Sequence, residues 1–138
     1  MSTYHLQTVF RPRSVAVVGG SPRERSAGRA VVRNLRAGGF AGQIGWVNPR
    51  HAEIDGMRTV KRLKDLPWIP DLVVVTTPAA MVPQVVAAAA DLGVAAAIIL
   101  TAGLGRGPGS LAAQVEAAAR PKGMRILGPH CLGVIAPH

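Results

Sequence analysis

The chain has 138 residues, 49% of them hydrophobic, which is enough for one domain with a buried core, and it has no apolar run of membrane-spanning length. Its net charge is +9, but the arginines are spread from Arg11 to Arg125 without interleaved aromatic residues, which disfavours nucleic acid as a partner. The single cysteine, Cys131, excludes an internal disulfide, and together with the lack of a signal-peptide pattern it favours the cytoplasm.

Taken in chain order, short apolar runs alternate with longer amphipathic segments. The apolar runs predict five strands, at residues 15–18, 44–47, 72–76, 95–100 and 124–127. The amphipathic segments predict helices at residues 28–37, 81–92 and 110–119, the last with Ser110 as its N-cap. Residues 51–64 are expected to be irregular, with a turn at Asp55-Gly56 and a short helix near residues 60–64.

Continuous apolar strands separated by helices are typical of a parallel sheet that is covered on both faces. With right-handed crossovers, the pattern predicts an α/β fold, namely a Rossmann-like, doubly wound parallel sheet of about five strands with helices on both faces. Residues 1–138 are expected to form this single domain. Ligands of such sheets bind at the carboxyl ends of the strands, so the segments that follow the strands should meet along one edge.

The segment Gly19-Gly20-Ser21 lies between the first strand and the first helix, and it is the leading candidate for an anion site. Backbone N–H groups at a helix N-terminus attract phosphate because of their direction and the helix dipole. Arg23 and Arg25 in the same loop add positive charge. We therefore expect a phosphate-bearing small molecule at this turn.

The motifs narrow the choice of phosphate compound. The turn lacks the G-x-G-x-x-G spacing of dinucleotide sites, and no Gly-Lys-Ser/Thr triplet for a Walker A loop occurs in the chain. After the second strand, where an NAD site has an acid, the chain has Asn48-Pro49-Arg50. An arginine at that place suits a phosphate on the ribose, which disfavours NAD and leaves NADP and coenzyme A open.

A series of short motifs runs through the chain in a fixed order. It includes Gly38-Gly39-Phe40, Gly42-Gln43-Ile44, Val47-Asn48-Pro49, Ile54-Asp55-Gly56, Leu66-Pro67, Thr77-Pro78-Ala79, Ala102-Gly103 and Gly128-Pro129. Together with residues 14–21, 71–75 and 97–100, this ordered set resembles the CoA-binding domain of the ADP-forming acyl-CoA synthetases, a family related to the succinyl-CoA synthetase α chain. The same domain occurs in some bacterial protein acetyltransferases. The resemblance extends from about Phe10 to the C-terminus.

The resemblance implies coenzyme A (CoA) as the ligand and gives roles to three segments. In the family the first glycine turn holds the CoA phosphates, which carries over to Gly19-Gly20-Ser21. The segment after the second strand reaches the adenosine end, which carries over to Asn48-Pro49-Arg50. The Thr-Pro stretch lies against the nucleotide, which carries over to Thr77-Pro78.

Two loops depart from the family pattern. Gly103-Leu104-Gly105-Arg106 replaces a Gly-Phe with a nearby Glu, and Gly128-Pro129-His130-Cys131 replaces Gly-Pro-Asn-Cys. These departures leave the roles of His130 and Cys131 open. The family's phosphorylated histidine lies in a following domain, so we expect no catalytic residue in this chain, and its histidines and cysteine lack the spacing of a metal site.

The expected function is that of the CoA-binding module of an ADP-forming acyl-CoA synthetase of the acetate–CoA ligase type, inactive as this chain alone. The expected partners are CoA or acyl-CoA, together with further ligase domains or a β-like ATP-grasp subunit. Three alternatives stay open: a regulatory CoA or nucleotide sensor without catalysis, the CoA-binding part of a protein acetyltransferase, and an NADP-dependent enzyme domain.

Overall fold

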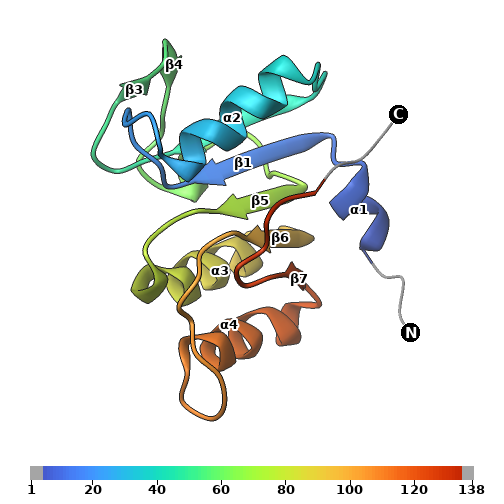
Figure 1. Cartoon of the computed structure of the whole chain (residues 1–138). Coiled ribbons are helices and arrows are strands. Elements are labelled where there is room, and N and C mark those ends of the chain that lie inside the picture. Colours follow the sequence, from blue (N-terminus) through green and yellow to red (C-terminus); the bar gives the residue numbers. More distant parts are fainter. Residues whose placement is uncertain (1–4, 135–138) are drawn as a thin grey trace.

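Five parallel strands form the centre of the structure, a computed structural model that describes residues 5–134 (Figure 1). The strands are β1 (Ser14–Val18), β2 (Gln43–Val47), β5 (Leu72–Val75), β6 (Ala96–Ile99) and β7 (Arg125–Leu127). Their order across the sheet is β2-β1-β5-β6-β7, and every pairing in it is parallel. The direction of winding therefore switches between β1 and β5, which confirms the predicted doubly wound sheet.

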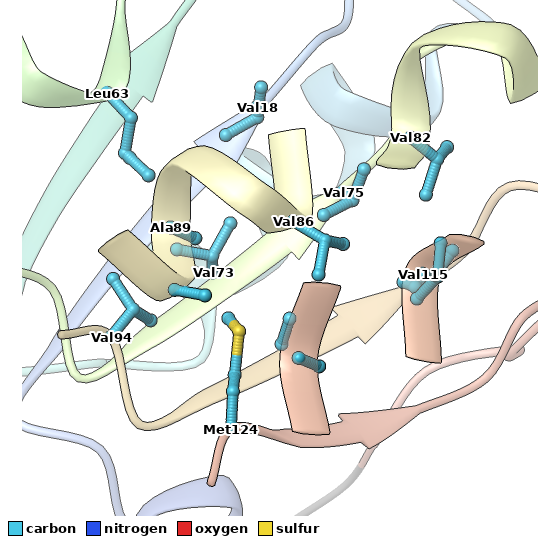
Figure 2. Packing of buried hydrophobic residues seen from close by; sticks show 14 of the residues in the cluster. Val18, Leu63, Val73, Val75, Val82, Val86, Ala89, Val94, Val115 and Met124 are labelled. Atoms are coloured by element: carbon cyan, nitrogen blue, oxygen red, sulfur yellow. The ribbon is translucent and has the colours of Figure 1, made fainter. Parts of the chain in front are cut away.

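Helices cover both faces of this sheet, as the sequence predicts. Helix α2 (Ala27–Ala37) lies on one face, and α3 (Val82–Asp91) and α4 (Leu111–Ala119) lie on the other. Successive residues of a strand point to opposite faces, so β1 contributes to two separate cores. Val15 and Val17 belong to one buried cluster together with Val32 of α2. Val18 belongs to the other cluster, which includes Val86 of α3 (Figure 2).

Serine is the N-cap residue of two of these helices. The Ser26 hydroxyl accepts a hydrogen bond from the N–H of Arg29 at the start of α2. The Ser110 hydroxyl accepts one from the N–H of Ala113 at the start of α4, which confirms the predicted cap. Both helices therefore start with one of their otherwise unpaired N–H groups satisfied.

Several short elements complete the chain. They are α1 (Leu6–Phe10), the hairpin of β3 (Glu53–Ile54) and β4 (Met57–Arg58), and the 3-10 turns η1 (Leu63–Asp65), η2 (Ala79–Met81) and η3 (Arg120–Lys122). The hairpin turns at Asp55-Gly56, where the sequence predicts a turn, but it lies in a region that we expected to be irregular. Strands of two residues are too short to show an alternating pattern. None of the helices within residues 5–134 is long and apolar enough to cross a membrane.

Candidate functional site

The loops that follow the parallel strands lie along one edge of the sheet, and hydrogen bonds join them to one another. The arrowheads of β1 and β5 point towards this edge in Figure 1. The N–H of Gly19 donates to the Val47 carbonyl at 3.0 Å, which joins the ends of β1 and β2. On the other side, the Thr101 hydroxyl donates to the Thr77 carbonyl at 2.7 Å, and the N–H of His130 donates to the Thr101 carbonyl at 3.0 Å. The structure thus brings the predicted loops together at one edge.

The glycine turn after β1 packs tightly on its neighbours. Gly19 has a φ of +107°, and a Cβ placed on it would lie 2.7 Å from Oγ1 of Thr76. A Cβ on Gly28, in the first turn of α2, would lie 2.8 Å from the Gly19 carbonyl oxygen. Only glycine allows the turn, the helix N-terminus and the end of β5 to approach this closely. As a result, backbone without side chains lies at the point between β1 and β5 where the direction of winding switches. Ligands of doubly wound sheets bind at such a point.

Some backbone N–H groups of the glycine turn and of the first turn of α2 are paired within the chain, and others are unpaired. The N–H of Ser21 donates to the Ser26 hydroxyl at 2.8 Å, so this group is used within the chain. Within residues 5–134, the N–H groups of Gly20, Ala27 and Gly28 have no hydrogen-bond partner. These three groups lie around the start of α2, so they are the available donors for an anion.

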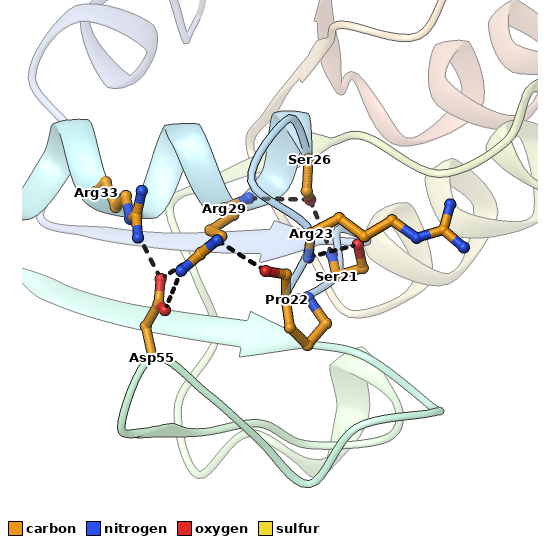
Figure 3. A network of polar contacts seen from close by, with 7 residues as sticks. All are labelled: Ser21, Pro22, Arg23, Ser26, Arg29, Arg33 and Asp55. Atoms are coloured by element: carbon orange, nitrogen blue, oxygen red, sulfur yellow. Dashed lines mark hydrogen bonds and ion pairs between the residues drawn. The ribbon is translucent and has the colours of Figure 1, made fainter.

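Arg29 of α2 braces the loop of residues 21–25 against the β3–β4 hairpin (Figure 3). Its Nε and Nη2 donate to the two carboxylate oxygens of Asp55, each at 2.8 Å, and its Nη1 donates to the Pro22 carbonyl at 2.7 Å. The hydrogen bond from Arg29 lowers the pKa of Asp55, and the same contact raises the pKa of Arg29. Arg23 is exposed and extends away from this network, so its charge is available to a ligand (Figure 3). Arg25 is exposed as well.

Asn48, at the end of β2, fixes the direction of the loop that follows it. Its side chain is buried, and its Nδ2 donates to the Gly20 carbonyl at 2.7 Å. Its Oδ1 accepts from the N–H groups of Arg50 and His51, at 2.8 and 3.1 Å. The amide is thus occupied by the protein itself, and its effect is to hold the glycine turn and to point Arg50 outward. Pro49 and Arg50 are both exposed.

Thr77 follows β5 and has a buried hydroxyl without a partner. The residue is 7% exposed, and its Oγ1 makes no hydrogen bond with any described residue. It lines a cavity of about 570 Å³ that begins at the edge of the sheet between Gly19 and Pro49. The lining is mainly apolar, and it is contributed by Val18, Val47, Leu63, Val85, Ala88 and Leu92. Volume and lining are those of a typical small-molecule pocket. Pro78, next to Thr77, is exposed at the start of η2.

Three cationic side chains line the same cavity, and our sequence analysis did not identify them. They are Lys61, Arg62 and Lys64, which lie immediately before and within η1. Nothing in their local sequence distinguishes them from an ordinary charged surface. They could be found only from the fold, which places them beside the loop after β2.

The loop after β7 lies at the same edge. His130 is exposed, with a φ of +54°, and Cys131 is half-buried and donates its N–H to the Ile99 carbonyl at 3.1 Å. In the part of the chain that the structure describes, no three His, Cys, Asp or Glu side chains gather in a way that could hold a metal ion.

The residues at this edge suit a nucleotide that carries phosphate groups. Unpaired N–H groups and Arg23 suit a phosphate, and the apolar cavity suits a flat ring. The unpartnered Thr77 hydroxyl offers a hydrogen bond to such a ring, and the exposed Arg50 directly follows Pro49, which lines the cavity.

Comparison with known proteins identifies one protein family. Residues 13–137 match the model of a family described as a CoA binding domain. An ADP-forming acetate–CoA ligase of Methanocaldococcus jannaschii is 35% identical over 136 residues, which are 98% of this chain and 19% of that protein. The α subunit of ADP-forming acetate–CoA ligase I of Pyrococcus furiosus is 35% identical over 137 residues, 94% of this chain and 30% of the subunit. The chain therefore spans less than a third of these curated relatives.

Solved structures agree with this match. The dinucleotide-forming acetyl-coenzyme A synthetase 1 of Ca. Korarchaeum cryptofilum superimposes with a TM-score of 0.85 at 31% identity, over 93% of this chain and 28% of that one. A protein from Thermus thermophilus superimposes with a TM-score of 0.73 at 24% identity, over 96% of this chain and 94% of that one. The second likeness concerns the fold alone.

Proposed function

The chain belongs to the CoA-binding domain family, and from this premise we propose that it is the CoA-holding module of an ADP-forming acyl-CoA ligase. Membership confirms the resemblance drawn from the ordered motifs, including its tie to the acetate–CoA ligases. CoA, free or acylated, is the ligand of the module. The activation of the acid and the transfer of the acyl group take place in further domains or subunits.

The observation that carries this proposal is the tight junction of Gly19, Gly28 and Thr77 where the winding switches. The junction leaves backbone donors uncovered, and it opens directly into the cavity that Thr77 lines. A ligand that joins a diphosphate to a nucleoside ring can occupy both places at once. CoA has this composition, and its pantetheine arm can extend from the diphosphate along the edge.

We assign the predicted residues to three parts of CoA. The turn Gly19-Gly20-Ser21 receives the diphosphate, and Arg23 and Arg25 add charge nearby. The segment Asn48-Pro49-Arg50 receives the ribose with its 3′-phosphate, with Arg50 as the contacting cation. Thr77-Pro78 lies against the nucleoside. The polar contacts of Asn48 and Ser21 make them positioning residues in this arrangement.

A second candidate function is that of a free-standing CoA-binding regulator. The Thermus thermophilus protein, which this chain covers over 94% of its length, has the same fold at about this size. A regulator would bind CoA through the same edge. A regulator would not need a nucleotide-hydrolysing partner. If the chain co-purified with an ATP-grasp subunit, that result would favour the ligase over the regulator.

Calorimetric titration of the purified chain with CoA, NADP and NAD tests the proposal. CoA should bind most tightly and NAD most weakly, because Arg50 stands where an NAD site carries an acid. Tighter binding of NAD than of CoA would overturn the proposal. If NADP bound most tightly of the three, the alternative of an NADP-dependent enzyme domain would be favoured instead.

A further inference from the structure

A segment beyond β2 extends the edge of the sheet and carries Lys61. Val60 forms a parallel bridge with Val47, the last residue of β2. The N–H of Val60 donates to the Trp46 carbonyl at 2.9 Å, and the N–H of Asn48 donates to the Val60 carbonyl at 2.8 Å. Residues paired in this way advance together, so Lys61 lies level with the start of the loop Asn48-Pro49-Arg50.

The core holds this segment in place. Leu63, two residues after Lys61, is 6% exposed and belongs to the same buried cluster as Val47 and Val18, the latter labelled in Figure 2. The backbone of residues 60–63 is therefore fixed both by strand pairing and by burial. Lys61 and Lys64 stand on either side of this buried leucine, and both line the cavity.

These lysines form one wall of the cavity, and they are not engaged elsewhere. The chain has three lysines, and two of them, Lys61 and Lys64, are on this wall. Neither makes a hydrogen bond or an ion pair with any of residues 5–134, whereas Arg62 between them pairs with Asp65 at 3.4 Å. The opposite wall, from α3, carries the neutral Gln84 and Val85 and a single acid, Asp91. The wall of residues 61–64 therefore gives the cavity a positive side.

The cavity shows an independent sign of a ligand in the buried, unpartnered hydroxyl of Thr77. A buried hydroxyl without a partner has a free-energy cost, and a polar ring in the cavity removes that cost. When such a ring lies beside Thr77, the sugar attached to it lies at the opening, between Pro49 and the lysine wall. A phosphate on that sugar would lie close to the positive charges of residues 61–64 and of Arg50, which follows Pro49.

We propose that Lys61, supported by Lys64, binds the 3′-phosphate of CoA across the opening from Arg50 and thereby makes the site selective for CoA over dephospho-CoA. This inference rests on the proposed CoA function and adds a second, separate group of cations to it. Two flexible ammonium groups and one guanidinium then share a dianionic phosphate. Lysine serves here as a point charge, which suits an opening exposed to solvent.

Calorimetry on the double variant Lys61→Ala/Lys64→Ala tests the proposal, with Lys122→Ala as the matched control in the distant turn η3. The affinity of the double variant for CoA should be lower than that of the wild-type chain by about tenfold or more, because charge-assisted contacts are lost. Its affinity for dephospho-CoA should stay within about twofold of the wild-type value. Equal losses for both ligands, or no loss for either, would overturn it. If the wild-type chain binds neither ligand, the proposed function itself fails; unchanged CoA binding by the variant would overturn only the lysine assignment.

A chemical footprint tests the same contact without any substitution. Reductive methylation of the wild-type chain, read by mass spectrometry, is compared in saturating adenosine 3′,5′-bisphosphate and in saturating adenosine 5′-monophosphate. Lys61 should be protected severalfold by the bisphosphate only, and Lys122 should be labelled equally in both. Equal labelling of Lys61 in the two nucleotides would contradict the proposal.

Discussion

Gly19 and Thr76 touch so closely that no side chain fits between them: a Cβ on Gly19 would lie 2.7 Å from the Thr76 hydroxyl oxygen. That hydroxyl is itself held, because it donates to the Val18 carbonyl at 3.0 Å. Neither partner can give way without loss of a contact between β1 and β5. The closeness of these two residues sets the shape of the edge at which we place the ligand.

Gly19→Ala should therefore destabilise the fold and weaken CoA binding together. A positive φ alone costs a residue with a side chain about 1–3 kcal/mol, and the contact with Thr76 adds to it. Gly39→Ala is the matched control, since Gly39 also has a positive φ (+76°) but has no atom within 4 Å of the added carbon. Denaturant unfolding should show a larger loss for Gly19→Ala. Equal losses would mean that the close approach has no energetic weight.

Arg50→Ala should weaken the binding of CoA more than that of dephospho-CoA. Asn48 accepts the N–H of Arg50, which is exposed and directly follows Pro49 at the cavity, so we expect its guanidinium to contact the 3′-phosphate that CoA carries and dephospho-CoA lacks. Loss of one charge-assisted contact typically costs about 1.5–3 kcal/mol, or roughly ten- to a hundredfold in affinity. Calorimetry at low and high salt checks this, and the difference should shrink as salt screens the exposed charge. Equal losses for both ligands would reduce Arg50 to a structural role.

Asp55→Asn should lower the stability of the chain at neutral pH but not in acid. The pKa of Asp55 is lowered below its ordinary value of 3.8, first by the hydrogen bond from Arg29. A carboxylate whose pKa is lower in the folded state stabilises the fold above its unfolded pKa, and it loses this effect as the pH falls through the folded pKa. Thermal unfolding between pH 7 and about pH 2.5 should show wild type and variant converging in acid. Glu116→Gln, whose side chain is 73% exposed, serves as the control and should leave stability nearly unchanged throughout. A gap that is constant with pH would contradict the role of the ion pair.

The chain alone should not make acetyl-CoA from acetate, ATP and CoA. It corresponds to 19% of the length of the Methanocaldococcus jannaschii ligase, and the resemblance places the family's phosphorylated histidine in another domain. A coupled assay for ADP release, with that complete ligase as the positive control, checks the expectation. Turnover above background by the purified chain would refute it.

The regular part of the fold could be predicted because its signals are local. Apolar runs and glycine turns marked the strands and the three long helices, and the structure places each boundary within one residue of the prediction. The loops expected to meet at the sheet edge followed from the parallel topology alone. The Ser110 cap was likewise visible, because a capping serine stands next to the helix that it begins.

The contacts that shape the site could not be predicted because they join distant residues. The brace between Arg29 and Asp55 connects positions 26 residues apart, and it depends on a hairpin whose strands have two residues each. The place of Lys61 depends on a single bridge from Val60 to Val47, which leaves no periodic pattern. Asn48 was expected at the adenosine end, but only the structure reveals that its amide is engaged by Gly20, Arg50 and His51.

The most direct test of the central claim is the map of backbone amide shifts when CoA is added to the isotopically labelled chain. The account predicts the largest changes at Gly19, Gly20, Thr77 and Lys61, along the carboxyl edge between β2 and β5. Residues of α1, which packs on β6, and of η3 should stay nearly unchanged. Binding with changes centred on α1 or on the outer face of α2, and none at Gly19 and Gly20, would contradict the account.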